Sequence, residues 1–124
     1  MIVTTAPSIE GFRIRETKGI VRGLIVRSPT LSQGFMGGLK KMVGGENAAF
    51  TEMCEQTRNQ AYEMLVQHTE EMGCNAVIGL RYDTSELGQG LTEVLCYGTA
   101  VVIETLNGEV VEHEKKVKEV GWEV

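Results

Sequence analysis

Three cysteines and two histidines are the residues of this sequence best suited to bind a soft metal ion. Cys54, Cys74 and Cys96 are each about twenty residues apart, so they form neither a CxxC metal knuckle nor a disulfide framework. We interpret Cys54 and Cys96 as small, structural core residues. Cys74 differs, because it follows a predicted helix and lies within about 9 Å of His68 in helical rise. A metal site built on Cys74 and His68 would need further ligands from a loop or another subunit.

Three charged residues beside apolar segments are the candidate ligand-binding groups. Arg58 lies next to the inward stripe of the predicted helix, and Glu93 lies near the start of an apolar strand. Either could be a site group or half of a structural ion pair, which is the more frequent role. Asp83 most simply starts a turn. No Ser/His/Asp or Cys/His arrangement is supported by the spacing, so we expect no enzymatic activity. An enzyme is the weakest of three alternatives, and these three charged residues would be its polar groups.

A long helix over residues 47–72 is the strongest pattern in the sequence, because apolar and small side chains recur at three-and-four spacing. Asn47 is the expected N-cap, and Gly73 stands where a left-handed C-terminal cap would end the helix. The predicted inward residues are Phe50, Met53, Cys54, Thr57, Ala61, Met64, Leu65, His68 and Met72. The preceding glycine-rich stretch, GFMGGLKKMVGGE, lacks the P-loop pattern, so we interpret it as a connector or a short marginal helix that begins near Ser28.

The strands are predicted from period-two patterns and from glycine. Residues 12–27 read as a long strand, bulged or bent at Gly19 and Gly23, and MIVTT before it as a short edge strand. A strand begins at residue 76 and enters a polar turn, DTSELGQG. The side chains expected to share one of its faces are Ala76, Ile78, Leu80 and Tyr82.

The returning strand, residues 91–104, is apolar on both faces. A sheet covered by one helix should be polar on its other face. Since a chain of 124 residues with one long helix has little else to cover that face, we expect it to pack on another copy of the chain.

Composition and charge exclude several classes of partner. The length of 124 residues fits one domain, and the net charge of −5, with no basic cluster, argues against nucleic acid. The longest apolar runs are far below the roughly 20 residues that cross a bilayer. The N-terminal residues lack the basic opening and apolar stretch of a signal peptide, so we expect a cytoplasmic protein that does not associate with membranes.

Four segments resemble the YbjQ-like family, whose members are described as heavy-metal-binding domains. They are GGE at 44–46, Arg58 in the long helix, GCNAVIGLRYD at 73–83 and EVLCYGTAVVIE at 93–104, in the family's order and spacing. The similarity covers residues 1–105. It implies a small two-layer α+β domain, an antiparallel β-sheet backed by one long α-helix, that assembles into a ring-like homo-oligomer, a pentamer. The family usually has alanine in place of Cys74, so the thiols of this chain are not the family's signature.

The expected function is therefore that of a non-enzymatic, cytoplasmic homo-oligomer that binds a divalent heavy-metal ion or a small ligand at subunit interfaces. Its candidate metal ligands are Cys74 and His68, and its candidate ligand-binding residues are Arg58, Asp83 and Glu93. The alternative is a structural or protein-interaction ring without a small ligand. Residues 106–124 form a C-terminal extension with a predicted short peripheral helix, although Asn107-Gly108 could instead turn a hairpin.

Overall fold

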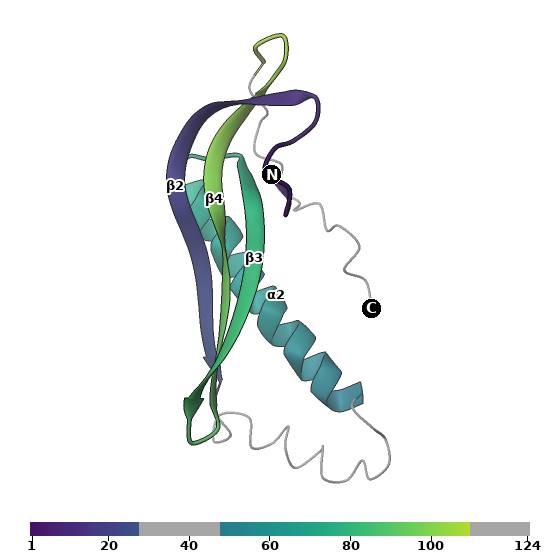
Figure 1. Ribbon diagram of the computed structural model, residues 1–124, viewed down its shortest axis with the longest axis vertical. Coiled ribbons are helices and arrows are strands. Elements are labelled where there is room, and N and C mark those ends of the chain that lie inside the picture. Colours follow the sequence, from purple (N-terminus) through teal and green to yellow (C-terminus); the bar gives the residue numbers. More distant parts are fainter. Residues whose placement is uncertain (28–47, 110–124) are drawn as a thin grey trace.

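A four-stranded sheet and one long helix form two layers in the computed structural model, which describes residues 1–27 and 48–109 (Figure 1). In chain order the elements are β1 (Ile2–Val3), β2 (Phe12–Arg27), α2 (Ala48–Glu71), β3 (Ala76–Gly88) and β4 (Leu91–Thr105). Their order in the sheet is β1-β3-β4-β2. The predicted two-layer α+β architecture is confirmed for these residues.

The sheet is mixed, so the prediction of a wholly antiparallel sheet is wrong. β4 pairs antiparallel with both β2 and β3, whereas the short edge strand β1 pairs parallel with β3, with Ile2 opposite Ala76. Parallel neighbours need a long connection, and the chain between β1 and β3, which includes β2 and α2, provides one.

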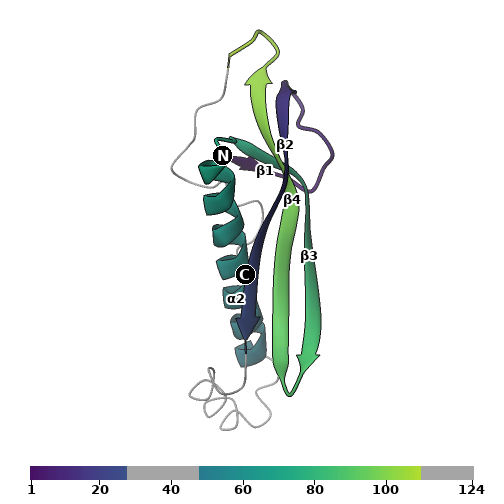
Figure 2. The same ribbon diagram turned by 90° about the vertical axis from the view of Figure 1, so that its left-hand side faces the viewer.

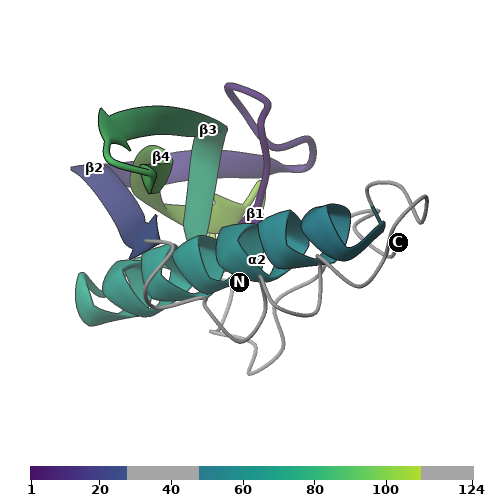
Figure 3. The ribbon, with the colours of Figure 1, turned by 90° about the horizontal axis from the view of Figure 1, so that it is seen from below.

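α2 lies across one face of the sheet, and the three views agree on this placement (Figures 1, 2 and 3). Every fourth residue along the helix is buried: Thr57, Ala61, Leu65 and Thr69. Cys54 and His68 lie outside this buried stripe and are exposed. The prediction that they face inward is therefore wrong.

The C-terminus of α2 ends as the sequence predicts. Gly73 has a φ of 74°, its N–H donates to the carbonyl of Glu70 at 2.9 Å, and Cys74 N–H donates to the carbonyl of Thr69 at 3.1 Å. These two bonds satisfy carbonyls that a helix end leaves unpaired, as in a Schellman motif. The chain is thereby turned directly into β3.

The contact between α2 and β2 is close at Gly23. A Cβ atom there would lie 1.9 Å from the carbonyl oxygen of Ala61. The pairing of β2 with β4 is continuous from Gly19 to Arg27, so the bulge predicted at Gly23 is wrong. The irregularity predicted near Gly19 is confirmed by a register shift between Thr17 and Gly19.

Side chains of α2 also bond to main-chain groups of β2. His68 Nδ1 donates to the carbonyl of Arg22 at 2.8 Å, and the N–H of Leu24 donates to Met64 Sδ at 3.4 Å. These groups belong to the outermost strand of the sheet, on the side away from β4. The helix therefore covers part of the β2 edge as well as one face of the sheet.

β3 contains a bulge that the sequence analysis did not predict. Gly79 has a φ of 62°, and the register with β4 shifts between Ile78 and Arg81. As a result Ala76 and Ile78 pack on one side of the sheet, while Leu80 and Tyr82 pack on the other. The prediction that these four residues share a face is wrong.

β3 continues to Gly88, through most of the stretch predicted as a turn. Gln89 and Gly90 alone connect it to β4, and both have positive φ, 54° and 78°. Two such residues suit the type I′ turn of a two-residue hairpin. Asp83 therefore lies within a strand, and the prediction that it starts a turn is wrong.

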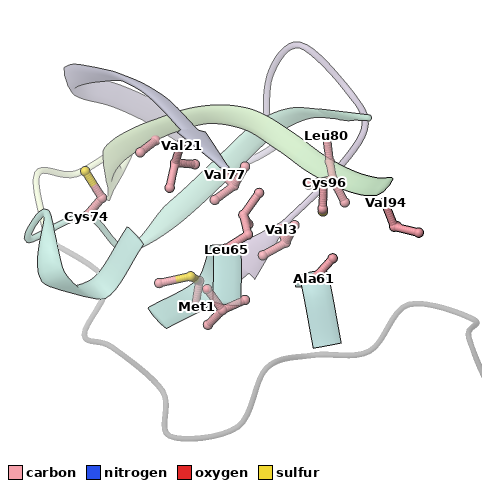
Figure 4. Close-up of a cluster of buried hydrophobic side chains, with 12 residues drawn as sticks. Met1, Val3, Val21, Ala61, Leu65, Cys74, Val77, Leu80, Val94 and Cys96 are labelled. Carbon is pink, nitrogen blue, oxygen red and sulfur yellow. The ribbon is translucent and has the colours of Figure 1, made fainter. Parts of the chain in front are cut away.

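The main core lies between α2 and the sheet, and Figure 4 shows its side chains converging from both layers. Leu65, Val77, Cys96 and Ala100 are among its fully buried members. A second, smaller cluster on the opposite side joins Val101 and Ile103 to Ile9 and other residues near the N-terminus. The chain therefore covers one end of its own second sheet face.

Several predictions lie outside the described residues: the helix start near Ser28, the glycine-rich connector, the Asn47 cap and the peripheral helix after residue 109. The turn signal at Asn107-Gly108 is confirmed, because Gly108 N–H donates to the carbonyl of Thr105 at 2.9 Å. Within residues 1–27 and 48–109, no helix is both long and apolar enough to span a membrane.

Candidate functional site

Cys74 and His68 stand in different surroundings, although they are near each other in the sequence. Cys74 is fully buried in the main core, where burial raises the pKa of its thiol. His68 is exposed, and its Nδ1 is already bonded to the carbonyl of Arg22. A carbonyl only accepts, so Nδ1 carries the proton and Nε2 is the nitrogen left for a metal or another partner.

The described part of a single subunit does not hold a heavy-metal site. Among residues 1–27 and 48–109, no group of three or more His, Cys, Asp and Glu side chains is placed to share an ion. A thiolate is the form that binds soft metals, and burial of Cys74 disfavours that form. The donors within the described residues therefore do not fit a heavy-metal ion without groups from elsewhere.

Arg58 of α2 contacts Tyr82, a partly buried residue of β3 that lies beside the buried Cys96. Its guanidinium lies 5.6 Å from the centroid of the Tyr82 ring, a cation–π contact. Tyr82 is paired with Cys96 across β3 and β4. Burial raises the pKa of Cys96 to about 11, and burial with the neighbouring Cys96 raises the pKa of Tyr82. Both groups therefore stay protonated near neutral pH, as structural core residues do.

Asp83 and Glu93 lie on the other side of the sheet. Asp83 of β3 is paired with Leu95 of β4, and Ser85 is paired with Glu93, two residues further along the same strands. Asp83 and Glu93 are therefore diagonal neighbours. Residues in that diagonal relation are within reach of each other on one sheet face. Of the three predicted ligand-binding residues, the structure thus places Asp83 and Glu93 on the same sheet face, on adjacent strands, and leaves Arg58 on the helix side.

Asp83 and Glu93 belong to a surface that we call the uncovered sheet face. Its apolar members are Ile20, Leu24, Val26, Leu95 and Tyr97. Its charged members are Arg22, Arg81, Asp83 and Glu93, two of each sign. Ile20 is 78% exposed and Val26 is 45% exposed, so large apolar side chains face solvent on this part of the chain.

A second feature is a hollow of about 720 Å³ beside the N-terminal segment. Residues 2–6 and 8–10 form one wall, Tyr62 of α2 another, and Leu80 and Tyr82 of β3 the third. Sequence reasoning missed it, because the hollow depends on where the segment before β2 docks. Pro7 and Gly11 indicate a loop there but do not indicate its position.

Comparison with known proteins supports a specific family. The family described as "Putative heavy-metal-binding", the YbjQ-like family, matches residues 1–104. A UPF0145 protein from Legionella pneumophila is 54% identical over 103 residues, which cover 83% of this chain and 98% of that protein. A UPF0145 protein from Chromobacterium violaceum is 48% identical, over 86% of this chain and 92% of that protein.

A solved structure shows the same fold. It is a protein of unknown function of the DUF74 family from Pediococcus pentosaceus, with a TM-score of 0.50 and 19% sequence identity. The alignment covers 84% of this chain and 98% of that chain. At this identity the likeness concerns the arrangement of strands and helix.

Proposed function

This chain belongs to the YbjQ-like family of UPF0145 proteins, and on that premise we propose that it is a non-enzymatic, cytoplasmic homo-oligomer that binds a heavy-metal ion or small ligand between subunits. The assembly is a ring, and the family resemblance implies five copies. The uncovered sheet face forms the contact between copies. Asp83 and Glu93, which lie on that face, are then the predicted ligand-binding groups that the contact includes.

The single observation that carries this proposal is the composition of the uncovered sheet face. Ile20, Leu24 and Val26 project from β2 as exposed large hydrophobic residues. Contiguous apolar groups of this kind, mixed with charges, are typical of protein interfaces. A second copy would bury these side chains, and two charges of each sign on the same face can pair across the contact.

Ligand binding at the interface follows from the distribution of donors. Two carboxylates lie on one sheet face, and among the described residues no group of three or more metal-binding side chains is placed to share an ion. A site that combines donors of adjacent copies meets the requirement of three or four ligands. His68, whose Nε2 is directed away from its bond to Arg22, is a further donor that a second subunit could use.

Native mass spectrometry tests the assembly. The wild-type protein is expected to have the mass of a ring, and Ile20→Glu is expected to give monomers, because the charge would be buried at the contact. Leu106→Glu is the matched control, since Leu106 is 71% exposed but lies outside the sheet. A wild-type monomer at micromolar concentration, or a ring unaffected by Ile20→Glu, would contradict the proposal.

Elemental analysis and titration with cadmium and zinc test the ligand. We expect binding that weakens in Asp83→Asn and Glu93→Gln, and the Cys74→Ser variant shows whether the thiol takes part. If the wild-type protein forms rings but binds neither metal more tightly than millimolar, the proposal that it binds a heavy metal is wrong. The protein is then a structural or protein-interaction ring, the alternative that the sequence leaves open.

A further inference from the structure

The hollow beside the N-terminal segment has the dimensions of a small-molecule site. Its volume of about 720 Å³ lies within the range of roughly 300 to 1,000 Å³ found for ligand pockets. Val3 and Leu80, which also belong to the main core, supply apolar surface, and Figure 4 shows both side chains. Because these residues are fixed by core packing, the floor of the hollow is rigid.

The outer wall is also held in place by hydrogen bonds between the main chain of residues 4–6 and β3. Thr4 N–H donates to the carbonyl of Val77 at 2.9 Å, and Leu80 N–H donates to the carbonyl of Thr4 at 3.0 Å. Gly79 N–H donates to the carbonyl of Ala6 at 2.9 Å, and the Arg81 guanidinium donates to the carbonyl of Thr5 at 3.0 Å. Because four hydrogen bonds fix this wall before a ligand arrives, binding would cost little conformational entropy.

The side chains of the hollow favour a cation. Glu10 is the charged residue among those that line it, and it forms no ion pair with the other described residues. Tyr62 and Tyr82 add two aromatic rings, and ring faces attract cations. The net charge of −5 also attracts cations to the protein at long range.

We propose that this hollow binds a small organic cation, an amine or quaternary ammonium group attached to an aromatic or aliphatic body. The body lies against Val3, Leu80 and the tyrosine rings, and the cationic group lies at the Glu10 carboxylate. The hollow is built within one subunit, and none of its lining residues belongs to the uncovered sheet face. The site is therefore independent of the interface site proposed above.

Calorimetric titration of the full-length protein with three matched probes tests the inference. Phenethylamine carries the cation, 2-phenylethanol is its neutral counterpart and 3-phenylpropionate is its anionic counterpart. Charges about 4 Å apart interact by about 1 kcal/mol even in water, so we expect the amine to bind at least ~5-fold more tightly than the alcohol. Glu10→Gln should remove that preference, whereas Glu86→Gln, which removes a carboxylate outside the hollow, should keep it.

Blocking variants locate the binding. Ala6→Trp and Ser8→Trp each place a large side chain at an exposed position that lines the hollow, and either should abolish amine binding. Gln67→Trp, at an exposed position on α2, is the control and should bind normally. Circular dichroism confirms folding of each variant, and native mass spectrometry of the same samples reports assembly separately.

Three outcomes would overturn the inference. Absence of saturable binding for all three probes shows that the hollow is not a ligand site. Amine binding that survives in both folded tryptophan variants places the ligand elsewhere. Equal affinity for amine and alcohol, or a preference that Glu10→Gln leaves intact, contradicts the cationic class. None of these outcomes depends on whether the protein forms rings.

Discussion

The side-chain amide of Asn75 bonds to both main-chain groups of Ile103. Asn75 Nδ2 donates to the carbonyl of Ile103 at 3.0 Å, and Ile103 N–H donates to Asn75 Oδ1 at 2.7 Å. The main chain of Asn75 also bonds to Val101 and to Ile2. One buried residue thus joins β1 and β4 at the point where α2 passes into β3.

Replacement of Asn75 by alanine is expected to destabilise the fold by about 3 kcal/mol. It would leave the N–H and carbonyl of Ile103 buried without these partners, and each unsatisfied group costs about 1 to 3 kcal/mol. Urea unfolding measures the change. Asn59→Ala, at an exposed position on α2, is the control and should stay within about 0.5 kcal/mol of wild type.

We expect Gly23→Ala to lower the stability of the fold more than Gly98→Ala does. Gly23→Ala places a Cβ 1.9 Å from a helix carbonyl oxygen, which cannot move without shifting α2. Gly98→Ala places its Cβ 2.7 Å from a methyl group of Val77 and 3.0 Å from the carbonyl oxygen of Ile78, which is a smaller overlap than at Gly23. We expect losses of about 3 kcal/mol or more for Gly23→Ala and about 1 kcal/mol for Gly98→Ala. Thermal unfolding that ranks Gly98→Ala as the worse variant would show that the helix is not fixed against β2.

The three thiols should differ sharply in reactivity. Cys54 is exposed, whereas Cys74 and Cys96 are fully buried and the pKa of each is raised by burial. A thiol reagent at pH 7.5 is expected to modify one cysteine of the native protein rapidly and the other two only on unfolding. Mass spectrometry of the product identifies Cys54 as the first site. Rapid modification of Cys74 would mean that its junction opens readily.

Stability should fall at alkaline pH because of Cys96. Burial raises its pKa from 9.0 to about 11 in the folded state, so the unfolded chain loses its proton first. The stabilising contribution is complete below pH 9 and is lost as pH rises toward 11, with a total of about 3 kcal/mol. The raised pKa of Tyr82 acts in the same direction above pH 10.

Urea unfolding between pH 8 and 11 measures this loss. Cys96→Ala should reduce the slope of stability against pH, even though it also removes a buried atom from the core. Cys54→Ala, at the exposed thiol, is the matched control and should retain the wild-type slope. An identical slope in the Cys96→Ala variant would assign the alkaline loss to another group.

The C-terminal extension should be dispensable for folding. The buried hydrophobic residues of the described core extend no further along the chain than Ile103. A variant that ends at Glu109 keeps every buried hydrophobic residue of the described core, so we expect it to fold, which urea unfolding measures against the full chain. Native mass spectrometry reports whether it assembles. If assembly is lost while the fold remains, the extension contributes to the contact between copies.

Local patterns predicted the elements well. Three-and-four spacing identifies the long helix, and Gly73 marks its end, because both depend on residues close together in the sequence. The bulge at Gly79 was not predictable in this way. Val77, Gly79 and Arg81 continue a regular alternation in the sequence, and only packing against α2 and the N-terminal segment decides that Leu80 turns toward the helix.

That bulge also decides which candidate site residues meet. It places Tyr82 toward Arg58 and leaves Asp83 on the uncovered sheet face beside Glu93. The sequence identified all three candidates as charged groups beside apolar segments, but it carries no signal for their partition between the two faces of the sheet. The hollow is a tertiary feature of the same kind, since it forms where a loop docks on a helix and a strand.

The bonds from α2 to β2 have a consequence for solubility. An outer strand presents unpaired N–H and carbonyl groups on which strands of other molecules can add, and natural sheets protect such edges. Here His68 donates a hydrogen bond to the carbonyl of Arg22, and Met64 accepts one from the N–H of Leu24. The α2 helix also blocks the access of another strand to this part of the edge. Around these two residues β2 is thereby protected against edge-to-edge aggregation, although its side chains include the hydrophobic run Leu24, Ile25 and Val26.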